Sequence, residues 1–171
     1  MAVVNTKSNI ITRLDSVPAK LPNAVIAHSR LREAVATVEV AAADDDTSTF
    51  RMVRLHSSYR VSAIEVFNDA ITNGTSYDVG LYDTNENGGL VVSAGLFASA
   101  VDLSSAHAAT GPLDVTYEAT ATNIDKIEKR LWELAGLTED PNKDFDLVLT
   151  GNTVGTAAGT ISVRVRFVAG D

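Results

Sequence analysis

The chain of 171 residues contains no cysteine, which excludes disulfide bonds and thiolate metal sites. This absence suits a protein that folds in a reducing cytoplasm. Long apolar runs are also missing, because an uncharged stretch such as residues 87–101 is too short and too rich in small residues to span a bilayer. The opening residues MAVVNTKSN turn polar by Asn5, so we expect neither a secretory signal nor a membrane span.

Basic residues are scarce and unevenly placed. Residues 1–32 contain five basic side chains against one carboxylate, a net charge of +4, and the formal total of −8 therefore leaves −12 for residues 33–171. The acidic part is a poor partner for nucleic acid, whose phosphates require clustered lysine and arginine. We expect no nucleic-acid binding, but the basic segment can contact an acidic protein surface. Its basic residues are Lys7, Arg13, Lys20, Arg30 and Arg32.

The same N-terminal segment lacks a recognised strand or helix pattern. Pro18 and Pro22 interrupt any helix and favour extended backbone. We therefore predict an extended basic arm over residues 1–32, followed by one compact body over residues 33–171. An arm of this kind cannot bury itself, and it becomes ordered by lying along a neighbour.

Alternation with a period of two residues dominates the body and predicts β-strands. In TISVRVRFV, residues Ile161, Val163, Val165 and Phe167 share one face, and polar residues share the other. The expected fold is mainly β, a jelly roll or β-sandwich of about eight strands with one helix. The predicted strands lie near residues 34–41, 49–56, 60–67, 76–83, 89–93, 112–118, 144–149 and 160–168.

One segment of the body follows a helical period instead. In TNIDKIEKRLWELAG, apolar residues are spaced by three, four and three, which predicts a helix over about residues 123–135. Thr122 or Asn123 can cap its first turn, and Gly136 can take the left-handed conformation just past its end. The apolar stripe consists of Ile124, Ile127, Leu131 and Leu134.

The stretch YDTNENGG, residues 82–89, has the D-x-N-x-N-G spacing that opens a calcium-binding loop. Two predicted strands flank it, whereas an EF-hand loop lies between helices. The twelfth loop position, which should carry a bidentate carboxylate, is Ala94. We therefore interpret the stretch as a turn between strands, in which the Asn-Gly pair supplies positive φ angles.

Residues that carry chemistry are few. His28, His56 and His107 are too scattered to form a recognisable ligand set, and DDD, residues 44–46, is interpreted as a solvated turn. No sequence motif of a hydrolase, zinc protease or phosphate-binding loop is found. We expect no enzyme activity, no cofactor and no metal site.

Three segments, RLREAVATVEVAAADDDTSTFR, FNDAITNGTSYDVGLYDTNENGG and EKRLWELAGLTEDPN, resemble the small head proteins that tailed bacteriophages use as capsid cement or decoration. They cover about a third of the chain, and none is a functional motif, so the resemblance transfers no site residue. It implies a virion protein, made in the host cytoplasm, that binds the capsid surface and cements neighbouring major capsid protein subunits. It also implies self-association as a dimer or trimer.

With that role, the five basic residues of the arm are the candidate capsid contacts. A tail-associated or fibre-associated phage protein is the first alternative, although neither internal repeats nor a coiled-coil seam is detected. A carbohydrate-binding β-sandwich is the second alternative. Such modules usually display aromatic platforms, and the ten aromatic residues here fall partly on inward faces of strands.

Overall fold

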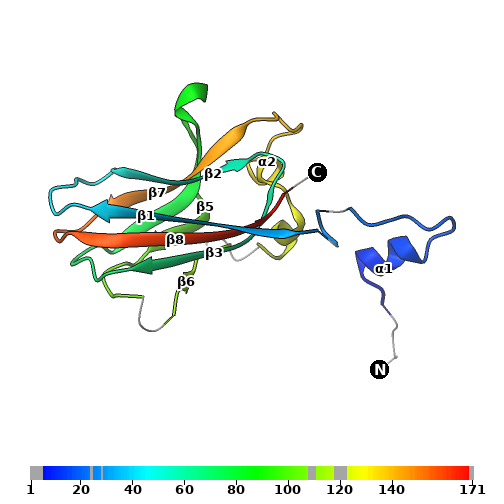
Figure 1. Cartoon of the computed structure of the whole chain (residues 1–171), viewed down its shortest axis with the longest axis horizontal. Helices are drawn as coiled ribbons and strands as arrows, with labels where there is room; N and C mark the ends of the chain where they lie inside the picture. The colour runs from blue at the N-terminus through cyan, green and yellow to red at the C-terminus, as the bar shows by residue number, and fades with distance from the viewer. Residues whose placement is uncertain (1–5, 24, 28, 108–110, 118–122, 170–171) are drawn as a thin grey trace.

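The structure is a computed structural model that describes residues 6–23, 25–27, 29–107, 111–117 and 123–169. Two four-stranded antiparallel sheets pack face to face, and an N-terminal arm projects from one end (Figure 1). The helical elements are α1 (Asn9–Leu14), η1 (Asn85–Asn87), η2 (Asn123–Glu128) and α2 (Leu131–Leu134). The strands are β1 (Leu31–Val40), β2 (Thr49–His56), β3 (Arg60–Asn68), β4 (Ser76–Asp83), β5 (Val91–Val101), β6 (Leu113–Asp114), β7 (Asp144–Thr153) and β8 (Gly159–Val168).

The order of the strands identifies the sandwich as a jelly roll. One sheet has the order β1-β8-β3-β6, and the other has β2-β7-β4-β5. Successive strands cross from one sheet to the other, except for β4 and β5, which form a hairpin within one sheet. Eight strands in two such sheets are the arrangement of a jelly roll. The predicted fold class is therefore confirmed, including its eight strands.

Burial along β8 follows the alternation in its sequence. Val163 and Val165 are fully buried, whereas Arg164 and Arg166 lie on the outer face. Phe167, predicted to face inward, is only partly buried and stacks on Tyr59 with 5.2 Å between ring centroids. Burying each large apolar side chain contributes about 1.5–3 kcal/mol before entropy is counted. The largest fully buried side chains are Tyr77, Phe97, Phe145, Leu55, Ile64, Ile71, Leu81, Leu103, Leu131, Leu147, Leu149 and Ile161.

The continuous helix predicted over residues 123–135 is wrong. The 3-10 helix η2 ends at Glu128, Arg130 is extended (φ −79°, ψ 165°), and α2 starts at Leu131. The first amides of α2 bond to the turn between β2 and β3: Leu131 donates to the carbonyl of Tyr59 (2.8 Å) and Trp132 to that of Ser57 (3.1 Å).

These tertiary hydrogen bonds replace the bonds that would continue one helix through Arg130. Gly136 does take the predicted left-handed conformation, with φ of 76°. Leu131 and Leu134 are buried, but Ile127 is 54% exposed. The proposed cap at Thr122 lies outside the described residues.

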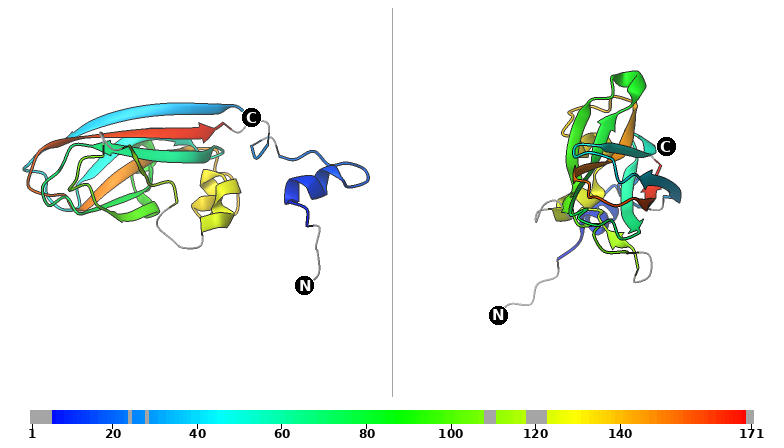
Figure 2. Two further views of the ribbon diagram at one scale, coloured as in Figure 1. Left: turned by 90° about the horizontal axis from the view of Figure 1, so that it is seen from below. Right: turned by 90° about the vertical axis from the view of Figure 1, so that its left-hand side faces the viewer.

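The arm is not extended throughout, because α1 forms ahead of Pro18 and Pro22. Both prolines lie after α1, so they limit its length and do not break it in the middle. Strand β1 begins at Leu31, two residues before the predicted start of the body. The arm lies beyond the end of the sandwich that also carries η2 and α2 (Figure 2).

Candidate interaction surface

The arm is attached to the body through Arg60 at the start of β3. Its Nε donates to the carbonyl of Val25 (3.0 Å), and its Nη1 donates to the carbonyl of Ile127 in η2 (3.1 Å). Val25 is only 3% exposed. One guanidinium therefore fixes both the base of the arm and the neighbouring 3-10 helix, so the arm leaves the body in a defined direction.

Helix α1 is held by caps and by one polar contact with the body. The Ser8 hydroxyl accepts a hydrogen bond from the amide of Ile11 (3.3 Å). Asn9 Nδ2 donates to both carboxylate oxygens of Glu128 in η2, at 2.9 and 3.0 Å. None of the six residues of α1 is buried. The helix thus lies against the body without contributing to its core.

Four apolar side chains within residues 6–23, the first described part of the arm, face solvent. Ile11 is 45% exposed, Leu14 40%, Val17 99% and Leu21 82%. The loop after α1 folds back, since the Lys20 amide donates to the Arg13 carbonyl (3.0 Å). The exposed apolar side chains and the basic side chains of Arg13 and Lys20 therefore belong to one folded-back unit of the arm. A cluster of exposed apolar side chains on a protein surface is typical of a contact with another protein.

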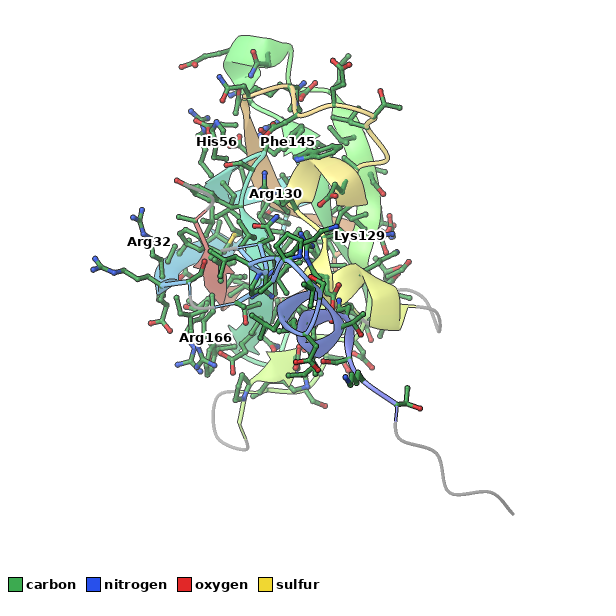
Figure 3. The ribbon with its side chains drawn as sticks, turned by 90° about the vertical axis from the view of Figure 1, so that its right-hand side faces the viewer. Arg32, His56, Lys129, Arg130, Phe145 and Arg166 are labelled. Carbon is green, nitrogen blue, oxygen red and sulfur yellow. The ribbon has the colours of Figure 1, made fainter. Side chains whose placement is uncertain are left out.

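The structure separates the five predicted contact residues into two groups. Lys7, Arg13 and Lys20 belong to α1 and its flanking turns, whereas Arg30 and Arg32 lie at the start of β1. All five are exposed. Figure 3 shows Arg32 projecting from the flank of the body, away from α1. Lys7 forms an ion pair with Asp15 at 2.8 Å, so part of its charge is compensated within the arm.

The apolar residues of the arm were missed in the sequence prediction, although a signal is present. Ile11, Leu14, Val17 and Leu21 are spaced by three, three and four, which is close to a helical stripe. Pro18 and Pro22 interrupt this pattern, so the sequence predicts an extended segment. The stripe ends in a turn rather than a longer helix, because Pro18 lacks the amide that a helix interior needs.

A second projection is formed by the connection between β4 and β5, the green turn at the top of Figure 1. The turn predicted from YDTNENGG is confirmed, with Gly88 at φ of 98° and Gly89 at 66°. Asn87 instead lies in η1, and its Nδ2 donates to the Thr84 hydroxyl (3.0 Å). Leu90 and Val91 at its base are 70% and 57% exposed.

A charged cluster holds this projection to the sheet. Arg51 donates to the carbonyls of Asp83 (2.8 Å) and Gly89 (3.0 Å), and to the carboxylate of Asp146 (2.8 Å). Arg54 donates to the other oxygen of Asp146 (2.9 Å). Burial would raise the pKa of Asp146, but the hydrogen bonds and charges of Arg54 and Arg51 hold that pKa below its usual value. The cluster is a structural support for the turn.

His56 and His107 each contact a polar side chain. His56 Nδ1 lies 2.9 Å from the Ser58 hydroxyl, and His107 Nδ1 lies 2.7 Å from Asn68 Oδ1. His28 lies outside the described residues. In the described part of the chain, no group of three or more histidine or carboxylate side chains is placed to hold a metal ion.

The helices among the described residues are all too short or too polar to cross a membrane.

No family model matches this chain, and no curated protein sequence matches it. Solved structures do. A chain in the capsid of Ralstonia phage GP4 aligns over 83% of this chain and 86% of its own, with a TM-score of 0.58 and 14% identity.

Weaker alignments are found with the capsid asymmetric unit of cyanophage Pam1 (TM-score 0.48, 17% identity, 90% and 96% covered) and with the acid-stable capsid of Helicobacter pylori bacteriophage KHP30 (0.47, 13%, 84% and 94%). At these identities the similarity concerns the fold alone.

Proposed function

We propose that this chain is a structural protein of the virion, which binds the outside of a tailed-phage capsid and cements neighbouring major capsid protein subunits. The observation that carries this proposal is the fold, which aligns over most of this chain and most of a chain in the GP4 capsid. Since the alignment covers similar shares of both chains, their lengths are similar. A compact β-sandwich of this size suits an accessory head protein.

The arm, residues 1–32, is the proposed anchor. Its described part exposes Leu14, Val17 and Leu21 together with basic side chains, and it adds no side chain of residues 6–22 to the core. A six-residue helix is too short to be stable in isolation. Docking against the major capsid protein would bury these side chains and stabilise α1, while the body stays on the outer surface.

In this role the protein acts by contact and not by catalysis. One copy needs only an interface of standard size, about 800 Å² per partner. Many copies repeated on a closed lattice then hold neighbouring capsid subunits together through avidity. Particles that lack the protein should burst at a lower temperature than complete particles.

Co-sedimentation with particles stripped of this protein tests the proposal. The full chain should sediment with the particles, and a chain that lacks residues 1–22 should stay in the supernatant although it is folded. Equal binding by both chains would eliminate the arm as the anchor. If neither chain binds, the capsid proposal fails and a tail-associated role becomes the better explanation.

A further inference from the structure

The two open sheets of the sandwich have four edge strands, and three of them are irregular or short. Strand β6 contains two residues, β2 has a register shift between Arg51 and Val53, and β5 has three register shifts against β4. Short strands and bulges are the usual devices that prevent an edge from pairing with another chain. These three edges are therefore protected.

Strand β1 lacks these devices. It pairs with β8 over ten consecutive residues, from Leu31 opposite Val168 to Val40 opposite Gly159, without a register shift. Residues 31–40 contain no proline or glycine, and the inward-facing positions Ala34, Ala36 and Val38 carry no charge. The free side of a long regular edge strand presents unpaired amides and carbonyls, which form a template for another strand.

The side chains on the outer face of β1 also favour a partner. The polar ones bond to β8: Thr37 lies 2.8 Å from the Ser162 hydroxyl, and Glu39 accepts a hydrogen bond from Thr160 (2.8 Å). The apolar ones stay open to solvent, since Leu31 is 57% exposed and Val35 is 64% exposed. Pairing along this edge would cover them.

We propose that β1 pairs antiparallel with β1 of a second copy of this chain. The pairing would join two β1-β8-β3-β6 sheets into one eight-stranded sheet across a two-fold axis. The contact is isologous, so each copy contributes the same residues.

The charges on β1 select the register. Two residues that are directly opposite in an antiparallel pair must have their side chains on the same face of the sheet. The two-fold axis must therefore lie between one residue of β1 and its own copy in the other strand, and that residue defines the register. An axis at Ala36 would place Glu33 opposite Glu39, and an axis at Glu33 would place two glutamates together; both arrangements oppose like charges.

An axis at Val35 avoids this repulsion. It also pairs residues 31–39, which is a longer part of the strand than an axis at Ala34 or Thr37 would pair. It places Val35 against its own copy and Glu33 opposite Thr37. The most exposed apolar side chain of the strand is then buried at the centre of the contact.

The dimer would also affect capsid binding, and this part of the inference rests on the proposed function. In an antiparallel pair the two β1 strands begin at opposite ends of the contact, so the two arms leave the dimer at opposite ends. One dimer could then anchor at two positions on the capsid and bridge them.

Cysteine crosslinking of the purified chain tests the pairing, and the absence of native cysteine makes each result specific. Val35→Cys should form a disulfide-linked dimer on mild oxidation, because opposed Cα atoms are about 4.5–5.5 Å apart and disulfides accept about 4.4–6.8 Å. Thr37→Cys alone should not crosslink, since its copy lies roughly 14 Å further along the strand. A mixture of Glu33→Cys and Thr37→Cys chains should crosslink to each other.

Light scattering provides the second measurement. The full chain should change reversibly from one to two chains of 18.1 kDa as its concentration rises. Val35→Lys should remain a single chain with an unchanged melting temperature, which separates lost pairing from lost folding.

A single-chain mass at all concentrations without crosslinking at Val35→Cys would overturn the proposal, as would crosslinking of Thr37→Cys alone as fast as Val35→Cys. A trimer that Val35→Lys leaves intact would also overturn it. None of these measurements uses a capsid, so the dimer can fail while capsid binding stands, and the reverse.

Discussion

Lys7 and Asp15 form an ion pair of 2.8 Å that links the two ends of α1. The pair leaves Arg13 and Lys20 as the basic side chains beside the exposed apolar residues at the tip of the arm. In the proposed anchor, we therefore expect charged side chains to contribute less to capsid binding than the sequence indicates, and apolar side chains to contribute more.

We therefore expect the double substitution Val17→Ser, Leu21→Ser to weaken capsid binding more than Arg13→Gln, Lys20→Gln does. Burying a large apolar side chain contributes about 1.5–3 kcal/mol, whereas an exposed ion pair contributes about 0.2–1 kcal/mol. The apolar variant should lose roughly 100-fold in affinity by co-sedimentation, since 1.4 kcal/mol is a factor of about ten. Loss of wild-type binding in 1 M salt would contradict this ranking.

The two faces of β8 should respond differently to substitution. Val163→Asp should abolish soluble expression, because an unpaired carboxylate would be buried where the valine is fully enclosed. Arg164→Ser removes an outward guanidinium bonded to Glu65 (2.6 Å), and it should change stability little because the pair lies on the solvated face. Soluble yield and urea unfolding measure both. Equal effects of the two changes would mean that the faces are assigned wrongly.

Asp146 should make stability depend on pH at the acidic end. Its pKa is lowered in the folded state, so its stabilising effect is complete above the unfolded pKa near 3.9 and is lost as pH falls through the folded value. Asp146→Asn should lower the free energy of unfolding at pH 7 by about 2 kcal/mol, because two arginines lose a charged acceptor.

The difference between this variant and the wild type should shrink as pH falls below about 4. Asp15→Asn, which breaks the half-exposed pair with Lys7, is the control and should change stability little at any pH. A constant difference for Asp146→Asn from pH 7 to pH 2.5 would refute the linkage.

Two glycines should differ in their tolerance of alanine. A Cβ at Gly80 would lie 2.0 Å from the Ser93 carbonyl oxygen and 2.2 Å from that of Ala94, so Gly80→Ala must displace β5 from β4. Gly88→Ala meets no atom within 4 Å and incurs only the strain of φ at 98°. Chemical denaturation should give a loss of about 1 kcal/mol for Gly88→Ala and clearly more for Gly80→Ala. Equal losses of stability in the two variants would show that β5 can move away from β4 at little cost.

Calcium should leave the thermal stability unchanged. In the loop that resembles a calcium site, Asp83 Oδ1 already lies 2.6 Å from Lys143 Nζ, and the Asp83 carbonyl accepts from Arg51. Melting in millimolar calcium and in chelator should therefore coincide. A rise in melting temperature that saturates with calcium, and that is absent in Asp83→Asn, would restore the metal interpretation.

The strands were predictable because burial on one face leaves a period of two in the sequence, as Val163, Arg164 and Val165 illustrate. Strand β5 extends to Val101, well past the predicted end at residue 93, since SAGLFASA has no such alternation. The break at Arg130 depends on hydrogen bonds to Tyr59 and Ser57, which lie about seventy residues away in the chain. No local pattern records such bonds.

The candidate surface was predictable only in part. Net charge located the arm, because basic residues need no tertiary context to be counted. The ion pair of Lys7 and the exposure of Val17 depend on how the arm folds back on itself, which composition does not encode. The two-sheet strand order likewise arises from pairings between distant segments, such as β1 with β8.

That pairing also determines where a foreign peptide can be displayed. Because Leu31 faces Val168, the last strand ends beside the root of the arm, so a passenger fused to the C-terminus would crowd the proposed attachment side. The turns between β1 and β2 and between β7 and β8 lie at the far end of the sandwich (Figure 1). Exposed residues 41–43 in the first of these turns offer an insertion point for an epitope far from the proposed anchor.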